Sequence, residues 1–139
     1  MTKILLVDDD DLQARAIELA LRRSGFGVDW AADGVEGMEI FRRLMPDLVI
    51  TDIVMPRRDG IGLISELRRI DPATPIIALS GGSILGRLQL LEQAIRVGAN
   101  ATMSKPVALA DLLAAVRRCL ATAGRPMPAA RLTGTAPLH

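Results

Sequence analysis

Short apolar segments alternate with longer segments of helical length along most of this chain, and this alternation constrains the fold more than any other feature. The apolar segments have the length of strands and span residues 4–7, 27–31, 48–51, 76–80 and 101–104. Two of them, LVI at 48–50 and IIAL at 76–79, are apolar at consecutive positions, which is typical of parallel strands covered on both faces. Five strands alternating with five helices predict an α/β domain with a parallel sheet.

The segments between the strands carry helical periodicity and capping residues. Four sets of apolar residues recur at helical spacing: Leu12, Ala16, Leu19 and Ala20; Val35, Met38, Phe41 and Leu44; Ile84, Leu88, Leu91 and Ile95; and Leu109, Leu113, Val116 and Leu120. An aspartate stands where a helix would begin at three places, namely Asp10 or Asp11, Asp33 and Asp59. Each pattern predicts a helix with one face toward the sheet.

Composition excludes several classes of protein. The net charge is +1, and the aromatic residues are Phe26, Trp30 and Phe41, so the chain lacks the basic excess and stacking aromatics of a nucleic-acid-binding domain. The single cysteine, Cys119, excludes a disulfide framework and a cysteine-based zinc site. No apolar run approaches about 20 residues, and the first one ends in four aspartates, unlike a signal peptide. We expect a cytoplasmic protein that contacts neither nucleic acid nor membrane directly.

The last part of the chain differs in composition from the rest. From Ala121 it reads ATAGRPMPAARLTGTAPLH, which contains three prolines and no apolar period. We expect one domain over residues 1–121 and a flexible Pro/Ala-rich tail over residues 122–139.

Polar residues follow four of the five predicted strands. A run of four aspartates that begins with Asp8 and Asp9 follows the first strand, and Asp52 follows the third. Ser80 ends the fourth strand, and Lys105 follows the fifth. Ligands of open parallel sheets bind beyond the carboxyl ends of the strands, so we expect these side chains to meet there. The second strand delivers no reactive side chain.

Clustered carboxyl groups at this edge indicate a divalent metal site. They raise each other's pKa unless a cation lies between them. An all-oxygen site suits Mg²⁺, which also binds phosphate oxygens, whereas zinc or copper would require cysteine or histidine and the one histidine is His139. Lys105, one of two lysines in the chain, offers a compact charge to a phosphate oxygen or to Asp52. Because a carboxylate can accept a phosphoryl group as an acyl phosphate, these residues predict a Mg²⁺-dependent site with Asp52 as the acceptor.

Four segments together resemble the receiver domain of bacterial two-component response regulators, from Lys3 to about Leu120: ILLVDDD, PDLVITDIVMPRRDG, PIIALSG and GANATMSKP. The resemblance implies a flavodoxin-like, doubly wound sheet of five parallel strands in the order 2-1-3-4-5 with five helices. It also implies a stand-alone receiver similar to the chemotaxis response regulator. Such a protein is a phosphoacceptor that catalyses only its own phosphorylation and dephosphorylation.

The resemblance implies a specific set of metal ligands. Asp9 would bind Mg²⁺ directly and Asp8 through water, while Asp52 and the backbone carbonyl of Val54 would complete the ligands from the protein.

The resemblance also implies contacts for the phosphoryl group and a class of partner. Ser80 and Lys105 would contact the phosphoryl group on Asp52, and the peptide bond between Lys105 and Pro106 would be cis. The phosphoryl donor would be a phosphohistidine of a sensor histidine kinase or a histidine phosphotransferase. Phosphorylation would switch binding to a downstream protein, and we expect a monomer or a weak dimer.

Three features depart from the family pattern. Thr102 stands where the family usually has an aromatic residue, and the stretch from Ser80 to Lys105 is about three residues longer than usual. Asn100-Ala101 replaces an acidic pair through which many DNA-binding members dimerise. We therefore expect the conformational switch to lie in Gly81-Gly82 and residues 83–86 instead of at Thr102.

Other functions remain open at this point. The chain could be the receiver part of a longer regulator whose output domain is absent. It could also be an aspartate-nucleophile phosphohydrolase, although such enzymes usually carry a second aspartate where this chain has Val54. A flavin-binding module of similar fold and a phosphate-independent scaffold are the remaining alternatives.

Overall fold

Five parallel strands form one sheet in the order β2-β1-β3-β4-β5 in a computed structural model of the protein, which describes residues 1–55, 59–81 and 84–128. The strands are β1 (Lys3–Val7), β2 (Gly27–Ala31), β3 (Leu48–Asp52), β4 (Ile76–Ser80) and β5 (Ala101–Ser104). Their bounds differ from the predicted segments by at most one residue at an end. The expected fold class and strand order are confirmed.

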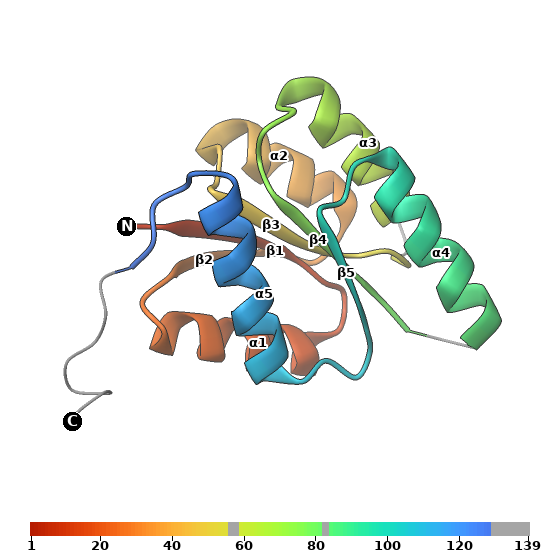
Figure 1. Ribbon diagram of the computed structural model, residues 1–139, viewed down its shortest axis with the longest axis horizontal. Coiled ribbons are helices and arrows are strands. Elements are labelled where there is room, and N and C mark those ends of the chain that lie inside the picture. The colour runs from red at the N-terminus through yellow and green to blue at the C-terminus, as the bar shows by residue number, and fades with distance from the viewer. Residues whose placement is uncertain (56–58, 82–83, 129–139) are drawn as a thin grey trace.

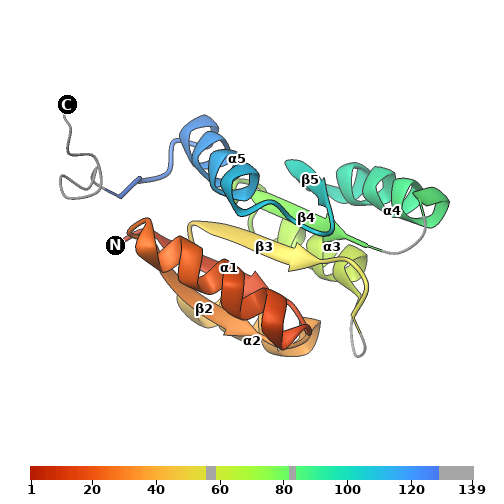
Figure 2. The same cartoon turned by 90° about the horizontal axis from the view of Figure 1, so that it is seen from below.

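Helices cover both faces of this sheet (Figure 1). They are α1 (Asp11–Arg23), α2 (Gly34–Leu44), α3 (Gly60–Ile70), α4 (Ile84–Val97) and α5 (Leu109–Thr122). Helices α1 and α5 lie on one face, and α2, α3 and α4 lie on the other, an arrangement that can be followed in Figure 2. Within the described ranges, no helix combines the length and the apolar content needed to cross a membrane.

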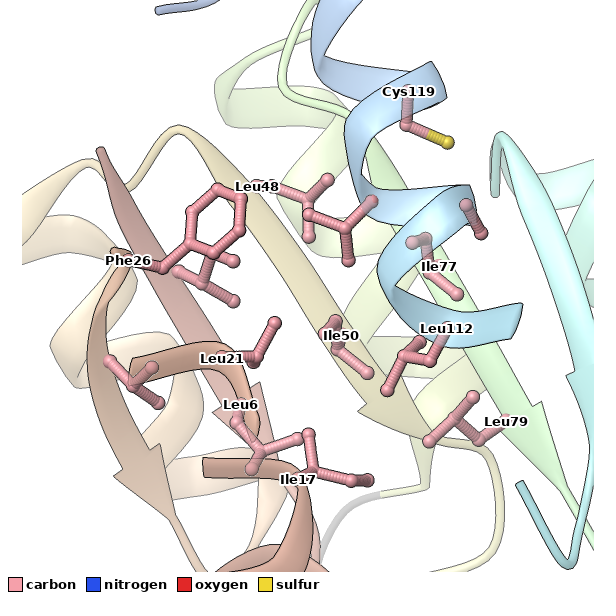
Figure 3. Packing of buried hydrophobic residues seen from close by; sticks show 14 of the residues in the cluster. Leu6, Ile17, Leu21, Phe26, Leu48, Ile50, Ile77, Leu79, Leu112 and Cys119 are labelled. Carbon is pink, nitrogen blue, oxygen red and sulfur yellow. The ribbon is translucent and has the colours of Figure 1, made fainter. Parts of the chain in front are cut away.

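The core consists of two apolar layers, one on each side of the sheet, because successive residues of a strand point to opposite faces. Figure 3 shows one layer, in which Leu21 of α1 and Leu112 of α5 pack near the strand residues Leu6, Ile50 and Leu79. Strands β3 and β4 are buried at every position, as their continuous apolar sequence predicted.

The buried faces of two helices differ from the predicted ones. In α1, Leu12 and Leu19 are 85% and 50% exposed. The α1 residues buried against the sheet are Ala14, Ile17 and Leu21. In α4, Leu88 and Ile95 are about half exposed, whereas Ala94 is buried. Both helices are apolar on more than one stripe, so the helical period alone did not determine which stripe faces the core.

The predicted helix caps are confirmed. The side chain of Asp10 accepts hydrogen bonds from the first turn of α1, and those of Asp33 and Asp59 do the same for α2 and α3. Each carboxylate satisfies backbone N–H groups that have no partner within the helix. Asp10 is thus engaged in capping, which separates it in role from Asp8 and Asp9.

The chain after α5 contacts the edge of the sheet where the strands begin. The N-terminus and the segment that leaves α5 lie at the same end of the molecule (Figure 1). The Thr2 hydroxyl donates a hydrogen bond to the Pro126 carbonyl at 3.0 Å, and Arg125 Nη2 lies 3.5 Å from Asp71 Oδ2. Residues 122–128 belong to the stretch expected to be a flexible tail, and residues 129–139 of that stretch lie outside the described ranges.

The Arg68 guanidinium joins two connections, α3–β4 and α4–β5, at the same end of the sheet. Its nitrogens donate to the carbonyl oxygens of Gly98, Asp71 and Thr74 at 2.9, 3.2 and 2.6 Å. A fourth hydrogen bond of 2.6 Å goes to Asn100 Oδ1. The guanidinium therefore ties the last turn of α3 to the chain before β4 and to the chain before β5.

Replacing Arg68 by alanine should lower the free energy of unfolding by about 2–3 kcal/mol, because several partly buried acceptors lose their donor. The neighbouring Arg69 is exposed and provides a matched control on the same helix. Arg69→Ala should change stability by less than about 0.5 kcal/mol. Urea unfolding of both variants measures the difference, and equal losses would contradict the role given to Arg68.

Candidate functional site

Three carboxyl groups meet at the carboxyl edge of the sheet. Asp52 is the last residue of β3 and is 1% exposed, and Asp8, directly after β1, is fully buried. Asp9 is exposed at the rim. One carboxylate oxygen from each of the three lies within 4.8 Å of the others. The adjacency of β1 and β3 thus brings together the acidic residues that the sequence placed at separate strand ends.

The ends of β4 and β5 bring a positive charge to this cluster. Lys105 Nζ lies 2.8 Å from Asp52 Oδ1 and forms an ion pair with it. The backbone N–H of Lys105 donates to the Ser80 carbonyl at 2.8 Å, which holds the start of the β5–α5 connection beside the end of β4. The peptide bond between Lys105 and Pro106 is cis, as expected.

The backbone after Asp52 packs directly against the start of α3. The N–H of Gly60 donates to the Ile53 carbonyl at 2.7 Å. A side chain on Gly60 would overlap the carbonyl oxygen of Asp52, so only glycine allows this approach. The close contact fixes the main chain on which the Asp52 carboxyl is mounted.

Burial and charge make the ionised form of Asp52 unfavourable. Desolvation by burial, together with the neighbouring Asp8 carboxyl, raises the pKa of Asp52 from 3.8 to about 8, and Lys105 offsets only part of this effect. Apart from the Lys105 ion pair, neither Asp52 carboxylate oxygen accepts a hydrogen bond within the described part of the chain. Asp8 Oδ2 is also buried without a hydrogen-bond partner there.

These oxygens fit the ligand set of a divalent metal ion. Hard cations prefer carboxylate oxygens, and buried polar atoms without partners are uncommon unless a water, an ion or a function accounts for them. A cation at this position would stabilise the ionised carboxylate that burial disfavours. The acidic cluster of Asp8, Asp9 and Asp52 could therefore bind a metal.

Two other predicted residues lie beside the cluster. Ser80 is 1% exposed at the end of β4, one register step beyond the pair formed by Asp52 and Leu79. Val54 follows Asp52 by two positions, and its side chain is 66% exposed. Of the segment expected to switch, residues 82–83 lie outside the described ranges, so that expectation stays a prediction.

Sequence reasoning gave β2 no role at the site, but the structure shows that β2 contacts it. The indole Nε1 of Trp30 donates a hydrogen bond of 2.8 Å to the backbone carbonyl of Asp8. The sequence feature that could have indicated this contact is the position of the single tryptophan near the end of the second strand, because the chain has only two other aromatic residues.

Comparison with known proteins gives a consistent family match. The family model described as response regulator receiver domain matches residues 4–117. Response regulator MprA of Mycobacterium leprae is 39% identical over 123 residues, covering 85% of this chain and 50% of its own length. Transcriptional regulatory protein PrrA of the same organism is 37% identical, with 88% and 51% covered. The chain therefore spans about half the length of these curated relatives.

Solved structures agree with this match. The crystal structure of a response regulator receiver domain protein from Clostridium thermocellum has a TM-score of 0.82 and 31% sequence identity, and the alignment covers 88% of this chain and 96% of that one. A CheY-like receiver domain protein from Methanospirillum hungatei has a TM-score of 0.81 at 27% identity, with 89% and 97% covered.

The raised pKa of Asp52 predicts a pH-dependent loss of stability in metal-free protein. Asp52 ionises near pH 3.8 in the unfolded chain and near pH 8 in the folded one. As pH rises from about 4 to 8, the folded state retains a proton that the unfolded state has released, so the free energy of unfolding falls. The slope contributed by Asp52 should be at most about 1.4 kcal/mol per pH unit.

The measurement is urea unfolding in EDTA at several pH values, with Asp52→Asn as the control that cannot ionise. The variant should gain stability relative to wild type as pH rises through this window, and excess divalent metal should reduce the difference by stabilising the wild type. Parallel pH profiles of the two proteins would contradict the raised pKa of Asp52.

Proposed function

Because this chain belongs to the response regulator receiver domain family, we propose that Asp52 accepts a phosphoryl group in a Mg²⁺-dependent reaction. The observation that carries the proposal is the buried Asp52 carboxyl, paired with Lys105 at 2.8 Å and grouped with Asp8 and Asp9. The phosphoryl donor is a phosphohistidine of a sensor histidine kinase or a histidine phosphotransferase. The domain acts as a phosphoacceptor that catalyses only its own phosphorylation and dephosphorylation.

The protein's own groups position and neutralise the transferred phosphoryl group. An oxygen of Asp52 bonds to phosphorus while the phosphorus–nitrogen bond of the phosphohistidine breaks, and the imidazole nitrogen keeps the electron pair. Lys105 offers its ammonium to a phosphoryl oxygen, and the Ser80 hydroxyl donates to another. Ser80 ends β4, which pairs with β3 beside Asp52, and Lys105 follows β5, the next strand beyond β4.

The metal ligands in this proposal are Asp8, Asp9, Asp52 and the backbone carbonyl of Val54. Bound Mg²⁺ supplies positive charge that neutralises the carboxylates and the phosphoryl oxygens. Within the described residues, Asp8 Oδ2 and Asp52 Oδ2 accept no hydrogen bond, which supports this assignment.

Phosphorylation then switches binding to a protein partner. The curated relatives are about twice as long as the stretch they share with this chain, which favours a receiver that works with an output domain. A stand-alone receiver that binds a separate protein uses the same chemistry at Asp52. The phosphohydrolase alternative gains no support, because Val54 offers no carboxylate two residues after Asp52.

Incubation with acetyl phosphate and Mg²⁺ should add one phosphoryl group to the wild-type protein, as measured by mass spectrometry. Asp52→Asn and wild type in EDTA should gain none, because acceptor or metal is missing. Asp9→Ala should require much more Mg²⁺ for labelling.

The matched control for Asp9→Ala is Asp10→Ala in the same aspartate run. Asp10 caps α1, so its loss should cost about 1 kcal/mol of stability and leave labelling close to wild type. Normal labelling of Asp52→Asn would refute Asp52 as the acceptor, and equal effects of the Asp9 and Asp10 variants would refute Asp9 as a ligand.

Loss of phosphate from Asp52 should be slow, because hydrolysis requires a water held in line with the bond between Asp52 and phosphorus. Val54 lies two residues after Asp52, and its exposed side chain offers no hydrogen bond to such a water. Val54→Asn should accelerate phosphate loss severalfold, whereas Val54→Ala, which adds no hydrogen-bonding group, should not. The time course of the phosphorylated mass measures both rates, and identical rates for the two variants would argue against this explanation.

A further inference from the structure

Three hydrogen bonds hold Asp8 in place, and its carboxylate oxygen Oδ2 takes part in none of them. Its N–H donates to the Ala31 carbonyl at 3.0 Å, and its carbonyl accepts from Trp30 Nε1 at 2.8 Å. Asp8 Oδ1 accepts from the N–H of Asp10 at 2.9 Å. The buried Oδ2 has no hydrogen-bond partner within the described ranges and lies in the cluster with Asp52.

Both backbone groups of Asp8 are therefore bound by the end of β2. The paired part of β1 ends at Val7, opposite Ala31, and Asp8 begins the turn toward α1. Trp30 pairs in register with Leu6, so its indole extends along the sheet to reach the Asp8 carbonyl. The ring is half-buried and packs against the core layer under α1 and α5. The last backbone hydrogen bond between β1 and β2 is the one from Asp8 N–H to Ala31, and the indole then supplies a donor for the Asp8 carbonyl.

We propose that Trp30 is a positioning residue for the metal site, which holds Asp8 in the orientation that directs Oδ2 toward the cluster. This inference rests on the proposed Mg²⁺-dependent function. Trp30 acts through Asp8 and has no contact of its own with the metal or the phosphoryl group. Trp30 contributes by preorganisation. When the turn at Asp8 is already ordered, metal binding does not have to order it, so binding is more favourable.

The expected change in Mg²⁺ affinity depends on the fraction of molecules in which the turn at Asp8 is ordered. Without the indole donor, the Asp8 carbonyl has to find water or another donor, and the turn can take other arrangements. The apparent dissociation constant rises in inverse proportion to the fraction of molecules that remain competent to bind. Loss of one hydrogen bond to a partly buried carbonyl should weaken Mg²⁺ binding by roughly 3- to 10-fold.

Because the chain contains one tryptophan, biosynthetic replacement of tryptophan changes Trp30 alone. Benzothienylalanine keeps the bicyclic ring but has sulfur in place of the N–H, so it tests the hydrogen bond with little change in packing. The matched control is 5-fluorotryptophan, which keeps the N–H. Trp30→Phe provides a second protein without the donor, should the benzothienyl protein fold poorly.

Two quantities are measured for each full-length protein: the Mg²⁺ dissociation constant by calorimetry and the free energy of unfolding in EDTA. We expect the benzothienyl and Trp30→Phe proteins to bind Mg²⁺ 3- to 10-fold more weakly than the native protein and the fluorotryptophan protein to bind like it. A residue with a merely structural role would lower stability and leave the affinity of the folded protein unchanged, which would overturn the proposal. A native protein that binds no Mg²⁺ would instead contradict the proposed function itself.

Discussion

The buried carboxyl group of Asp52 is the constraint on which the rest of the site depends. Burying a carboxylate is unfavourable unless charge and hydrogen bonds compensate for lost water. Here Asp8 adds a second buried carboxyl, and the ammonium of Lys105 contacts one oxygen of Asp52. Burial, together with the neighbouring Asp8 carboxyl, therefore raises the pKa of Asp52 to about 8, and Lys105 offsets only part of this effect. A site in this condition gains stability from any ligand that supplies positive charge.

The fold tolerates this cost because the remaining structure holds the carboxyl groups in place. Strand β3 is buried at every position, so the end of the strand cannot move away from the core without exposing apolar side chains. Gly60 packs against the Asp52 backbone, and the end of β2 holds Asp8 through Ala31 and Trp30. The main-chain positions of both carboxyl groups are therefore fixed by contacts outside the cluster.

The two ends of the sheet serve different purposes. The carboxyl ends of the strands carry the acidic residues and Lys105, and within the described residues Asp8 Oδ2 and Asp52 Oδ2 accept no hydrogen bond, which suits ligand binding. At the opposite end, the Arg68 guanidinium satisfies the carbonyl oxygens of the connections around β4 and β5, and Arg125 and Pro126 extend these contacts to the chain after α5. Among the described residues, Arg68 therefore satisfies its neighbours' acceptors at this end, whereas two carboxylate oxygens at the other end have no hydrogen-bond partner and can accept a ligand.

The sequence by itself determined the strands, the helix caps, the parallel topology and the side chains that gather at the carboxyl edge, because these follow from local periodicity and from which residue ends each strand. It did not determine which apolar stripe of α1 or α4 is buried, because the sheet selects among stripes of equal period. Nor did it reveal the indole of Trp30 on the Asp8 carbonyl, or the pKa of Asp52 near 8. Those features depend on distances between residues far apart in the chain, and only the packed tertiary structure sets such distances.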